Sequence, residues 1–382
     1  MPSRYSTIST SKVRTIKVRT INALAMKKVV LAFDSFKGCI SATEACEACA
    51  QGVRAACQNA VVVQIPLSDG GEGLVECVRR MLPTRSVAVE VHGPLMDKVK
   101  AEYAISADGR TAYMEMAAAS GLTLVPPERR NPLKATTYGV GEMIADAVKR
   151  GCREIVMGIG GSATCDGGRG MVEALDDCRC LYVDCQVIAA CDVNNPLFGK
   201  NGAAYVFAPQ KGATPEQVET LDGRLRAFAK ATELAGRATP ELAFSSGAGA
   251  AGGLGYALLA YLNANLHSGI DIMLDIAGFD AAIKDADLVI TGEGKSDEQT
   301  LMGKVPYGVL KRCRKANIPV WLLSGMIDDA TGRLAESFDL VRSINEGDTR
   351  PLSVLMQPNV AKQNLKESVS FLVANYHELS MN

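Results

Sequence analysis

The fold of this chain is decided by one stretch, Ala286-Asp287-Leu288-Val289-Ile290-Thr291-Gly292-Glu293-Gly294-Lys295-Ser296-Asp297-Glu298-Gln299-Thr300-Leu301-Met302-Gly303-Lys304. Its apolar run Leu288-Val289-Ile290 is typical of a parallel strand that is covered on both faces. After this run, glycines that let the backbone approach a ligand closely alternate with polar residues. These polar residues are Thr291, Glu293, Lys295 and Asp297. We therefore expect a ligand site at the carboxyl end of the strand; the alternative is an ordinary loop with solvated charges.

The beginning of the chain repeats this order of a strand followed by a polar turn. A strand predicted over residues 29–33 runs into Asp34-Ser35-Phe36-Lys37-Gly38, which places a hydroxyl and an ammonium group at the strand's carboxyl end. The helix after the turn begins with a capping box formed by Ser41 and Glu44.

A second strand, predicted over residues 61–65, runs into Ser68-Asp69-Gly70-Gly71-Glu72-Gly73. Two carboxylates among three glycines are unusual in a turn. Glycines alone would serve a plain turn, whereas Asp69 and Glu72 facing one crevice would suit a metal ion or a hydroxyl proton.

Two further units of this kind lie in the middle of the chain. A strand predicted over residues 155–157 leads into a glycine-rich loop over 158–170, and a strand over 187–190 ends just before Asp192. The loop fits a dinucleotide-binding fingerprint only loosely. Its hydroxyl and acid side chains fit the binding of a phosphate or a sugar acid better: Ser162, Thr164 and Asp166.

The composition favours an α/β enzyme. The chain has 382 residues, which is enough for two domains, and its 36 glycines against 5% aromatic residues favour many tight strand-to-helix turns. The formal net charge of −1 gives no reason to expect nucleic acid or an anionic membrane as a partner. No apolar run approaches the ~18 residues that a membrane-spanning helix needs.

The cysteines indicate a reducing, cytoplasmic compartment. The chain has twelve of them, scattered and mostly in apolar or helical settings, so we interpret them as small buried residues and not as a disulfide framework. Cys46 and Cys49 have the spacing of a redox or zinc motif. They lie within a predicted helix, however, without a second pair or a nearby histidine, so we interpret them as core residues.

Residues 1–25 differ from the rest of the chain. They are rich in Ser and Thr and contain Lys and Arg but no acid, which is the composition of a transit-like segment. Met26 directly precedes the first strand, and we favour it as the start of translation. In both cases we expect a disordered basic extension.

The pattern of strands and helices predicts two intertwined domains. Beyond about residue 80 the strand patterns become shorter and alternating, and the last third of the chain returns to the pattern of the beginning. We expect residues 26–80 and 286–382 to form a discontinuous Rossmann-like or flavodoxin-like α/β domain with a parallel sheet. Residues 81–285 would form an inserted α/β domain.

Strand ends that offer glycine, hydroxyl, carboxylate and lysine groups indicate a phosphoryl-transfer crevice, where a protein mainly positions reactants and stabilises charge. A P-loop enzyme is excluded, because Glu298 stands where the first glycine before Gly303-Lys304 would be required. None of the three histidines adjoins a candidate Ser or Cys nucleophile, so a catalytic triad is poorly supported.

An NAD-dependent oxidoreductase is the alternative enzyme class. Gly247-Ala248-Gly249-Ala250-Ala251-Gly252 matches the sequence G-x-G-x-x-G. The match is weak by itself, because residues 243–246 before it do not predict a convincing strand.

Eight blocks of the sequence resemble the glycerate kinase family that lacks a P-loop, the bacterial type. The blocks follow one another in the same order as in that family. They are the turns at 34–38 and 68–73, Glu115-Met116-Ala117-Ala118-Ala119-Ser120-Gly121-Leu122, 160–170, Ala190-Cys191-Asp192-Val193-Asn194-Asn195-Pro196, Pro209-Gln210-Lys211-Gly212-Ala213, 247–255 and Thr291-Gly292-Glu293-Gly294. The resemblance implies two intertwined domains with the active site between them and ATP-dependent phosphorylation of D-glycerate with Mg²⁺. It implies 2-phosphoglycerate as the product more than 3-phosphoglycerate. It leaves open whether the protein is a monomer or a homodimer.

On the basis of this resemblance we assign roles to individual residues. Lys37 and the amides of the glycine loops would hold the transferring phosphates, while Asp69, Asp192 or Glu293 would orient Mg²⁺ or accept the hydroxyl proton. A basic side chain would pair with the glycerate carboxylate, with Lys211, Arg169 and Lys304 as candidates. Asp69 and Asp192 are the candidate metal ligands. The residues expected to bind substrate or nucleotide are Ser35, Gly70, Gly71, Glu72, Gly160, Gly161, Ser162, Thr164, Asp166, Arg169, Lys211, Gly249, Gly252, Thr291, Gly292 and Lys304.

The chain departs from the family pattern in one segment. Between the helix that begins near Gly170 and the strand at 187 it is a few dozen residues shorter, and Leu175-Asp176-Asp177-Cys178-Arg179-Cys180-Leu181-Tyr182 replaces a longer strand and loop. If that segment supports the turn at Asp192, the chain would be a catalytically inactive homologue that only binds a small acid. This is the second alternative to a glycerate kinase.

Overall fold

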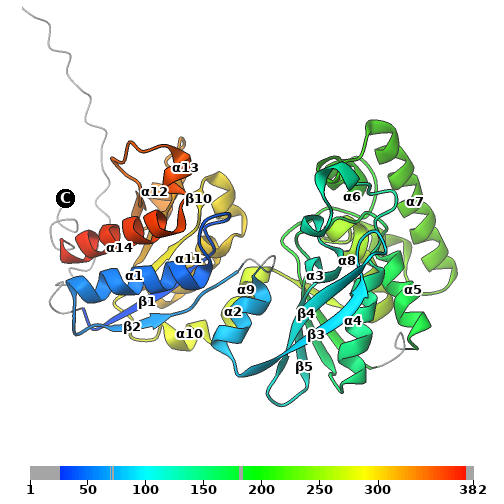
Figure 1. Ribbon diagram of the computed structural model, residues 1–382, viewed down its shortest axis with the longest axis horizontal. Coiled ribbons are helices and arrows are strands. Elements are labelled where there is room, and N and C mark those ends of the chain that lie inside the picture. The colour runs from blue at the N-terminus through cyan, green and yellow to red at the C-terminus, as the bar shows by residue number, and fades with distance from the viewer. Residues whose placement is uncertain (1–25, 69, 71–72, 180–183, 376–382) are drawn as a thin grey trace, which may run out of the picture.

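The computed structural model describes residues 26–68, 70, 73–179 and 184–375. The predictions for residues 1–25 and for Asp69, Gly71 and Glu72 lie outside the described residues. Within them the protein is α/β, as the sequence predicts, and its strands form two main sheets that lie in separate lobes (Figure 1).

The first lobe is built on a parallel sheet in the order β13-β11-β9-β1-β2. Its strands are β1 (Lys28–Phe33), β2 (Val61–Gln64), β9 (Leu288–Gly292), β11 (Val320–Ser324) and β13 (Leu340–Ser343). Counted along the chain within this sheet, the order is 2-1-3-4-5, which is the flavodoxin-like arrangement. The prediction of a flavodoxin-like parallel sheet made from both parts of the chain is therefore confirmed.

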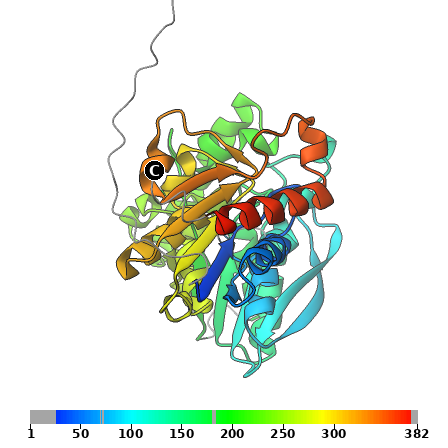
Figure 2. The ribbon, with the colours of Figure 1, turned by 90° about the vertical axis from the view of Figure 1, so that its left-hand side faces the viewer.

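Alternation along the strands explains why this sheet is covered on both faces. Val29, Leu31 and Phe33 pack in one apolar core with α1 (Ala42–Ala56) and α14 (Pro358–Ala374), which lie next to each other in Figure 2. Val30 and Ala32 point the other way, into a core that includes α11 (Val305–Ala316). The predicted capping box of Ser41 and Glu44 is present at the start of α1.

The second lobe is built on a mixed sheet in the order β3-β4-β5-β6-β7-β8. β3 (Thr84–His92), β4 (Lys98–Ser106) and β5 (Thr111–Glu115) are antiparallel neighbours. β6 (Glu154–Gly158), β7 (Gln186–Ala190) and β8 (Asn265–His267) continue the sheet in parallel. One face is covered by α4 (Tyr138–Lys149), α5 (Arg169–Asp177) and α8 (Ala250–Leu262). Farther out, α7 (Pro215–Leu234) packs with α6 (Ala203–Phe207) and begins with a capping box formed by Thr214 and Gln217.

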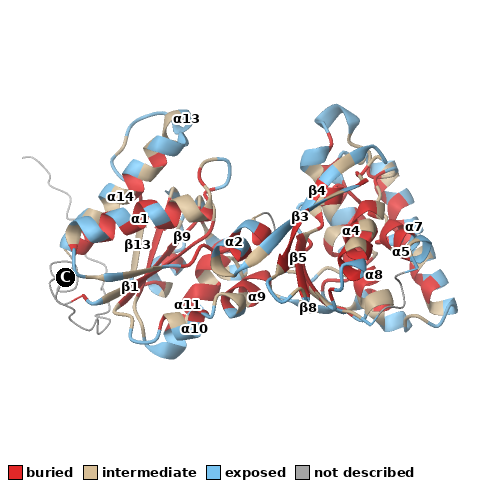
Figure 3. Ribbon diagram, turned by 60° about the horizontal axis from the view of Figure 1, so that its bottom comes forward, coloured by how far each residue is buried: buried red, intermediate tan, exposed pale blue. Residues whose placement is uncertain are grey.

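Two short helices, α2 (Leu74–Met81) and α9 (Gly269–Ile276), lie between the lobes in Figure 1. A single apolar core contains residues of both helices, Val30 and Val289 of the first sheet, and Tyr113 and Val156 of the second. Figure 3 shows that α2 and α9, between the two sheets, each carry buried residues on one side and more exposed residues on the other. The lobes thus share buried apolar contacts. The domain boundaries at residues 80 and 286 stay a prediction.

The remaining elements are short and connect the larger ones. They are α3 (Ala117–Ser120), α10 (Phe279–Ala282), α12 (Arg333–Ser337), α13 (Leu352–Leu355), β10 (Lys295–Ser296), β12 (Met326–Ile327) and the 3-10 helices η2 (Leu122–Leu124), η3 (Pro127–Arg129), η4 (Pro209–Lys211), η5 (Pro240–Phe244) and η6 (Glu298–Met302). Among the helices described, none is both long enough and apolar enough to cross a membrane.

Candidate active site

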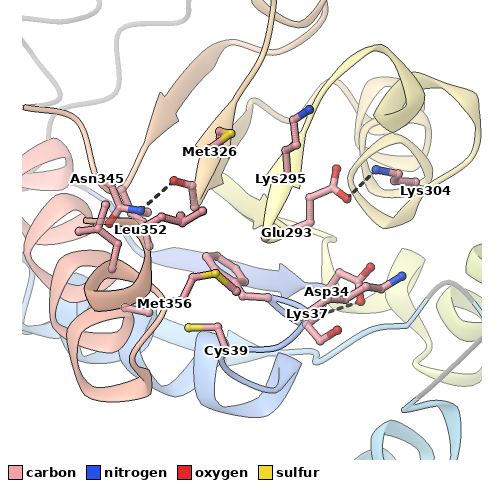
Figure 4. Close-up of a pocket in the computed structure, with 17 residues that line it drawn as sticks. Asp34, Lys37, Cys39, Glu293, Lys295, Lys304, Met326, Asn345, Leu352 and Met356 are labelled. Carbon is pink, nitrogen blue, oxygen red and sulfur yellow. Dashed lines mark hydrogen bonds and ion pairs between the residues drawn. The ribbon is translucent and has the colours of Figure 1, made fainter. Parts of the chain in front are cut away.

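A cavity of about 390 Å³ opens where β1 and β9 end. These strands are the neighbours at which the strand order of the first sheet reverses, the point where open α/β sheets bind ligands. We call it the switch-point cavity. Its charged side chains, shown in Figure 4, come from the turns after both strands: Asp34, Lys37, Glu293, Lys295 and Lys304.

Glu293 is the most constrained of these groups. Its side chain is buried, and its Oε1 accepts hydrogen bonds from Thr300 Oγ1 at 2.6 Å and Ser296 Oγ at 3.1 Å. Its Oε2 lies 3.3 Å from Lys304 Nζ. Ser296 Oγ is in turn 2.7 Å from Ser324 Oγ at the end of β11. Two hydroxyls and an ammonium group therefore hold the carboxylate in one orientation.

Asp34 lines the cavity although the sequence did not predict it as a site residue, only as the first residue of the turn after the first strand. It follows the last residue of β1, is only 5% exposed, and its Oδ1 accepts a hydrogen bond from Ser35 N at 2.6 Å. The available signal was its position as the first residue after a buried strand. Figure 4 places Asp34 and Lys37 across the cavity from Glu293 and Lys304.

Thr291 and Gly292 support the site from within the sheet. Thr291 is fully buried, and its Oγ1 donates to the carbonyl oxygen of Ala32 at 2.6 Å, which joins β9 to β1. A Cβ at Gly292 would lie 1.7 Å from the carbonyl oxygen of Leu323, so only glycine allows β11 to approach here. Their predicted contacts with a ligand stay a prediction.

A second cavity, of about 450 Å³, lies in the other lobe at the ends of β6 and β7. We call it the Lys211 cavity. Gly70, Gly160, Gly161, Ser162, Asp192 and Lys211 are among the residues that line it.

Lys211 is nearly fully buried in this cavity, with 3% of its surface exposed. Its Nζ donates to Ser162 Oγ at 2.6 Å and to the carbonyl oxygen of Thr164 at 2.7 Å, and both of these acceptors are uncharged. Burial lowers the pKa of Lys211 to about 8, against a smaller opposite effect of Cys165 and Asp166. A buried ammonium group that lines a cavity is suited to bind an anion.

Asp192 lies where the two lobes meet. It is exposed after the end of β7, and its Oδ1 accepts a hydrogen bond from Gly269 N, the first residue of α9, at 3.0 Å. It lines the Lys211 cavity and also a cavity of about 520 Å³ whose other wall includes Gly303 and Tyr307 from the first lobe. We call this the connecting cavity, because residues of both lobes line it.

The side chains of Asp166 and Arg169 bind other residues of the protein in this structure. The Asp166 carboxylate accepts hydrogen bonds from the amide and hydroxyl of Thr137, each at 2.8 Å, and from Gly168 N at 3.1 Å. Asp166 thereby ties the start of α5 to that of α4. Arg169 is exposed and forms an ion pair with Glu173 at 2.7 Å. Ligand contacts of Asp166 and Arg169 stay predictions.

The G-x-G-x-x-G run is packed against backbone. A Cβ at Gly249 would lie 2.2 Å from the carbonyl oxygen of Pro196, and one at Gly252 would lie 2.0 Å from that of Thr164. The element before the run is the 3-10 helix η5 and not a strand. A dinucleotide loop needs a preceding strand and open backbone for the pyrophosphate. The NAD-dependent alternative is therefore not favoured.

The candidate ligands for a divalent cation are a few carboxylates that line the cavities. Within the described ranges, no group of three or more His, Cys, Asp or Glu side chains is placed to hold a metal ion. Mg²⁺ is usually held by one or two carboxylates together with water and phosphate oxygens. Asp34 and Glu293, which line the same cavity, meet this requirement, and Asp192 offers a single carboxylate.

The fold and these sites together define a class of protein. Buried carboxylates beside lysines at the switch point of a flavodoxin-like sheet, with a buried lysine facing a second cavity, are suited to a phosphate-handling α/β enzyme.

Comparison with known proteins identifies the family. The family model described as "Glycerate kinase family" matches residues 29–178 and 176–376. A protein named glycerate kinase from Halalkalibacterium halodurans is 43% identical over 331 residues, which cover 79% of this chain and 86% of that protein. The Escherichia coli (strain K12) protein named glycerate 2-kinase is 42% identical over 332 residues, covering 80% and 87%. A solved structure from Salmonella typhimurium LT2, named as a glycerate kinase 2, superimposes with a TM-score of 0.80 at 40% identity, covering 92% of this chain and 99% of that one. The chain therefore belongs to the glycerate kinase family, as the resemblance predicted.

The comparisons also show a difference in length between this chain and a relative. The two matched ranges of the family model meet at residues 176–178. The alignment with the Halalkalibacterium halodurans protein runs over 331 residues but takes in only 79% of this 382-residue chain, so the relative has residues without a counterpart here. The boundary between the two matched ranges of the family model falls in the segment 175–187, where we expect the chain to be shortened.

Proposed function

We propose that this protein transfers the γ-phosphate of ATP to the C2 hydroxyl of D-glycerate and forms 2-phosphoglycerate. The names of the relatives support glycerate as the acceptor, and the name of the Escherichia coli relative supports a 2-kinase. The observation that carries the proposal is the arrangement of the cavities. The connecting cavity shares Asp192 with the Lys211 cavity and is bordered by Gly303, the neighbour of Lys304 in the switch-point cavity.

The donor phosphates bind at the charged end of the switch-point cavity. Lys37 and Lys304 neutralise the phosphate oxygens, and the amides of the turns after β1 and β9 donate hydrogen bonds to them. Asp34 and Glu293 would hold Mg²⁺, which would supply positive charge to the phosphates. Thr300 and Ser296 keep the Glu293 carboxylate turned toward this end of the cavity.

The acceptor binds in the Lys211 cavity. The buried ammonium group of Lys211 pairs with the glycerate carboxylate, a charge-assisted contact that offsets the cost of its burial. This places the C2 hydroxyl, which is one bond nearer to the carboxylate than the C3 hydroxyl, toward Asp192. The hydroxyl oxygen bonds to the γ-phosphorus, the bond from that phosphorus to the β-phosphate oxygen breaks, and the hydroxyl proton passes to Asp192.

The test is an ADP-release assay with D-glycerate, ATP and Mg²⁺ on protein that starts at Met26, followed by ³¹P NMR of the product. We expect turnover that requires D-glycerate and gives 2-phosphoglycerate. The variant Asp192→Asn should lose a factor of about 10²–10⁴ in kcat, the usual contribution of a general base. Asp176→Asn, at an exposed position on α5, is the matched control and should keep full turnover.

Three results would contradict the proposal, each in a different part. Release of ADP without D-glycerate would remove glycerate as the acceptor. Formation of 3-phosphoglycerate would overturn the choice of hydroxyl. Full turnover of Asp192→Asn would remove that residue as the base.

A further inference from the structure

The switch-point cavity has two ends of opposite chemistry. Figure 4 shows Asp34, Lys37, Glu293 and Lys304 at one end and Asn345, Leu352 and Met356 at the other. The second end is lined mainly by apolar side chains: Phe36 after β1, Ile344 after β13, Leu352 and Leu355 on α13, and Met326 and Met356.

Several of these apolar side chains are exposed although they are large. Met326 is 45% exposed, Leu352 is 56% exposed and Met356 is 41% exposed. Exposed apolar side chains scattered singly over a surface are ordinary, but three that line one cavity indicate a ligand. A cavity of about 390 Å³ is in the range of small-molecule sites, which combine apolar walls with a few polar groups.

We propose that this apolar end is the binding site for the purine base of the phosphate donor. The inference rests on the proposed function, because it takes the donor to be a nucleoside triphosphate. The base lies between α13 and the turn after β1, and the phosphate chain extends to Lys37 and Lys304. Lys304 follows Gly303 of the connecting cavity, so the γ-phosphate is directed toward the side on which Asp192 lies.

The base is held by apolar contact more than by hydrogen bonds from side chains. Asn345 lines the cavity, but its Nδ2 donates to the carbonyl oxygen of Gly325 at 2.8 Å and its Oδ1 accepts from Asn364 Nδ2 at 2.8 Å. Its amide therefore secures the end of β13 to β11 and α14. Thioether and aliphatic side chains, such as those of Met326, Met356 and Leu352, provide burial for a flat ring. A polyphosphate without a base would fill the charged end only.

The test compares two probes on the full chain by isothermal titration calorimetry without any acceptor: ADP, and inorganic triphosphate, which has no base. The double variant Leu352→Gln with Met356→Gln should weaken ADP binding by about tenfold or more, the usual effect of losing an apolar pocket contact. Its Kd for triphosphate should not change. Because both side chains are exposed, the variant should keep the thermal midpoint of the wild-type protein. The matched control is Leu234→Gln at the end of α7, a side chain that is 78% exposed, which should change neither Kd.

The outcomes separate this inference from the proposed function. An unchanged Kd for ADP in the double variant would overturn the base site. An equal loss of affinity for ADP and for triphosphate in the double variant would also overturn it. So would a wild-type protein that binds triphosphate as tightly as ADP. None of these measurements needs glycerate. A protein that binds ADP through this end but phosphorylates a different acceptor would keep the inference and contradict only the proposed function.

Discussion

Replacing Lys211 by Met should change how the stability of the protein depends on pH. The ammonium group is nearly fully buried, and its pKa of about 8 in the folded protein lies below the ordinary value of 10.5. The unfolded chain therefore binds more protons than the folded one between about pH 8 and pH 10.5, so the free energy of unfolding of the wild-type protein should rise with pH across that window. This lowering of the pKa corresponds to a rise of roughly 3 kcal/mol in the free energy of unfolding across the window.

Lys211→Met keeps the length of the side chain and removes the group that titrates. It also removes the hydrogen bonds to Ser162 and Thr164, but that loss is present at every pH. We therefore expect the stability of the variant relative to wild type to fall by roughly 3 kcal/mol between pH 8 and pH 10.5. Urea unfolding of both proteins at pH 7, 8, 9 and 10 measures this difference. If the difference in the free energy of unfolding between the two proteins stays constant from pH 7 to pH 10, burial does not destabilise the charged form of Lys211 and the reasoning is refuted.

The same replacement tests the role of Lys211 in acceptor binding. Hydrogen bonds to charged groups contribute about 1.5–3 kcal/mol, so the KM for D-glycerate should rise roughly 10- to 100-fold. The KM for ATP should not change, because the donor binds in the other cavity. In the wild-type protein the KM for glycerate should rise above pH 8 as the ammonium group loses its proton. A variant with the wild-type KM for glycerate would remove Lys211 from the acceptor site.

Two further changes test the support of the sites. Thr300→Val removes the hydroxyl 2.6 Å from Glu293 Oε1 and should lower kcat about tenfold with little change in the KM for ATP. Thr300→Ser keeps a hydroxyl and should have the kcat of the wild-type protein. Equal kcat values in all three proteins would show that this hydrogen bond does not position Glu293. Gly252→Ala should lower the urea midpoint more than Gly236→Ala. Both positions have a positive φ, which costs an alanine about 1–3 kcal/mol in backbone strain. Only at Gly252 would the added Cβ also meet backbone, the carbonyl oxygen of Thr164 at 2.0 Å. Equal midpoints for the two glycine variants would mean that the packing at Gly252 adjusts without cost.

The elements that carry the fold could be predicted from the sequence because their signals are local. The strand expected over residues 29–33 is β1, which begins one residue earlier, and the predicted capping box at Ser41 begins α1. The apolar run at Leu288 forms β9 in the middle of a parallel sheet, where it is buried on both faces. Each of these signals lies within a few residues of the element it defines.

The grouping of the strand ends could not be predicted, because sheet order depends on contacts between distant parts of the chain. The sequence suggested one crevice for all the glycine-bearing turns. In the structure, Lys37 and Glu293 line one cavity, whereas Ser162, Asp192 and Lys211 line another. The four-residue helix α13, which supplies Leu352 and Leu355, is too short to show a hydrophobic period.

Residue type alone also did not distinguish residues that could contact a ligand from residues whose polar groups are hydrogen-bonded within the protein. Asp166 and Thr291 carry the polar groups expected of a binding site, and both are bonded within the protein. The partners of Glu293 were missed for a related reason. Thr300 and Ser296 look like ordinary loop residues in the sequence, and only the fold of η6 brings their hydroxyls to the carboxylate.

The shortened segment bears directly on whether the chain can act as an enzyme. If the missing residues were needed to support the turn at Asp192, the structure of that turn would depend on the chain between α5 and β7. The described contacts come from elsewhere: β7 pairs along its whole length with β6, Cys191 N donates to the carbonyl oxygen of His267 on β8, and Asp192 Oδ1 accepts from Gly269 N of α9. The supports of Asp192 are thus neighbouring strands and a helix that the shortening leaves in place. This favours an active kinase over an inactive homologue, and the ADP-release assay on wild-type protein decides between them.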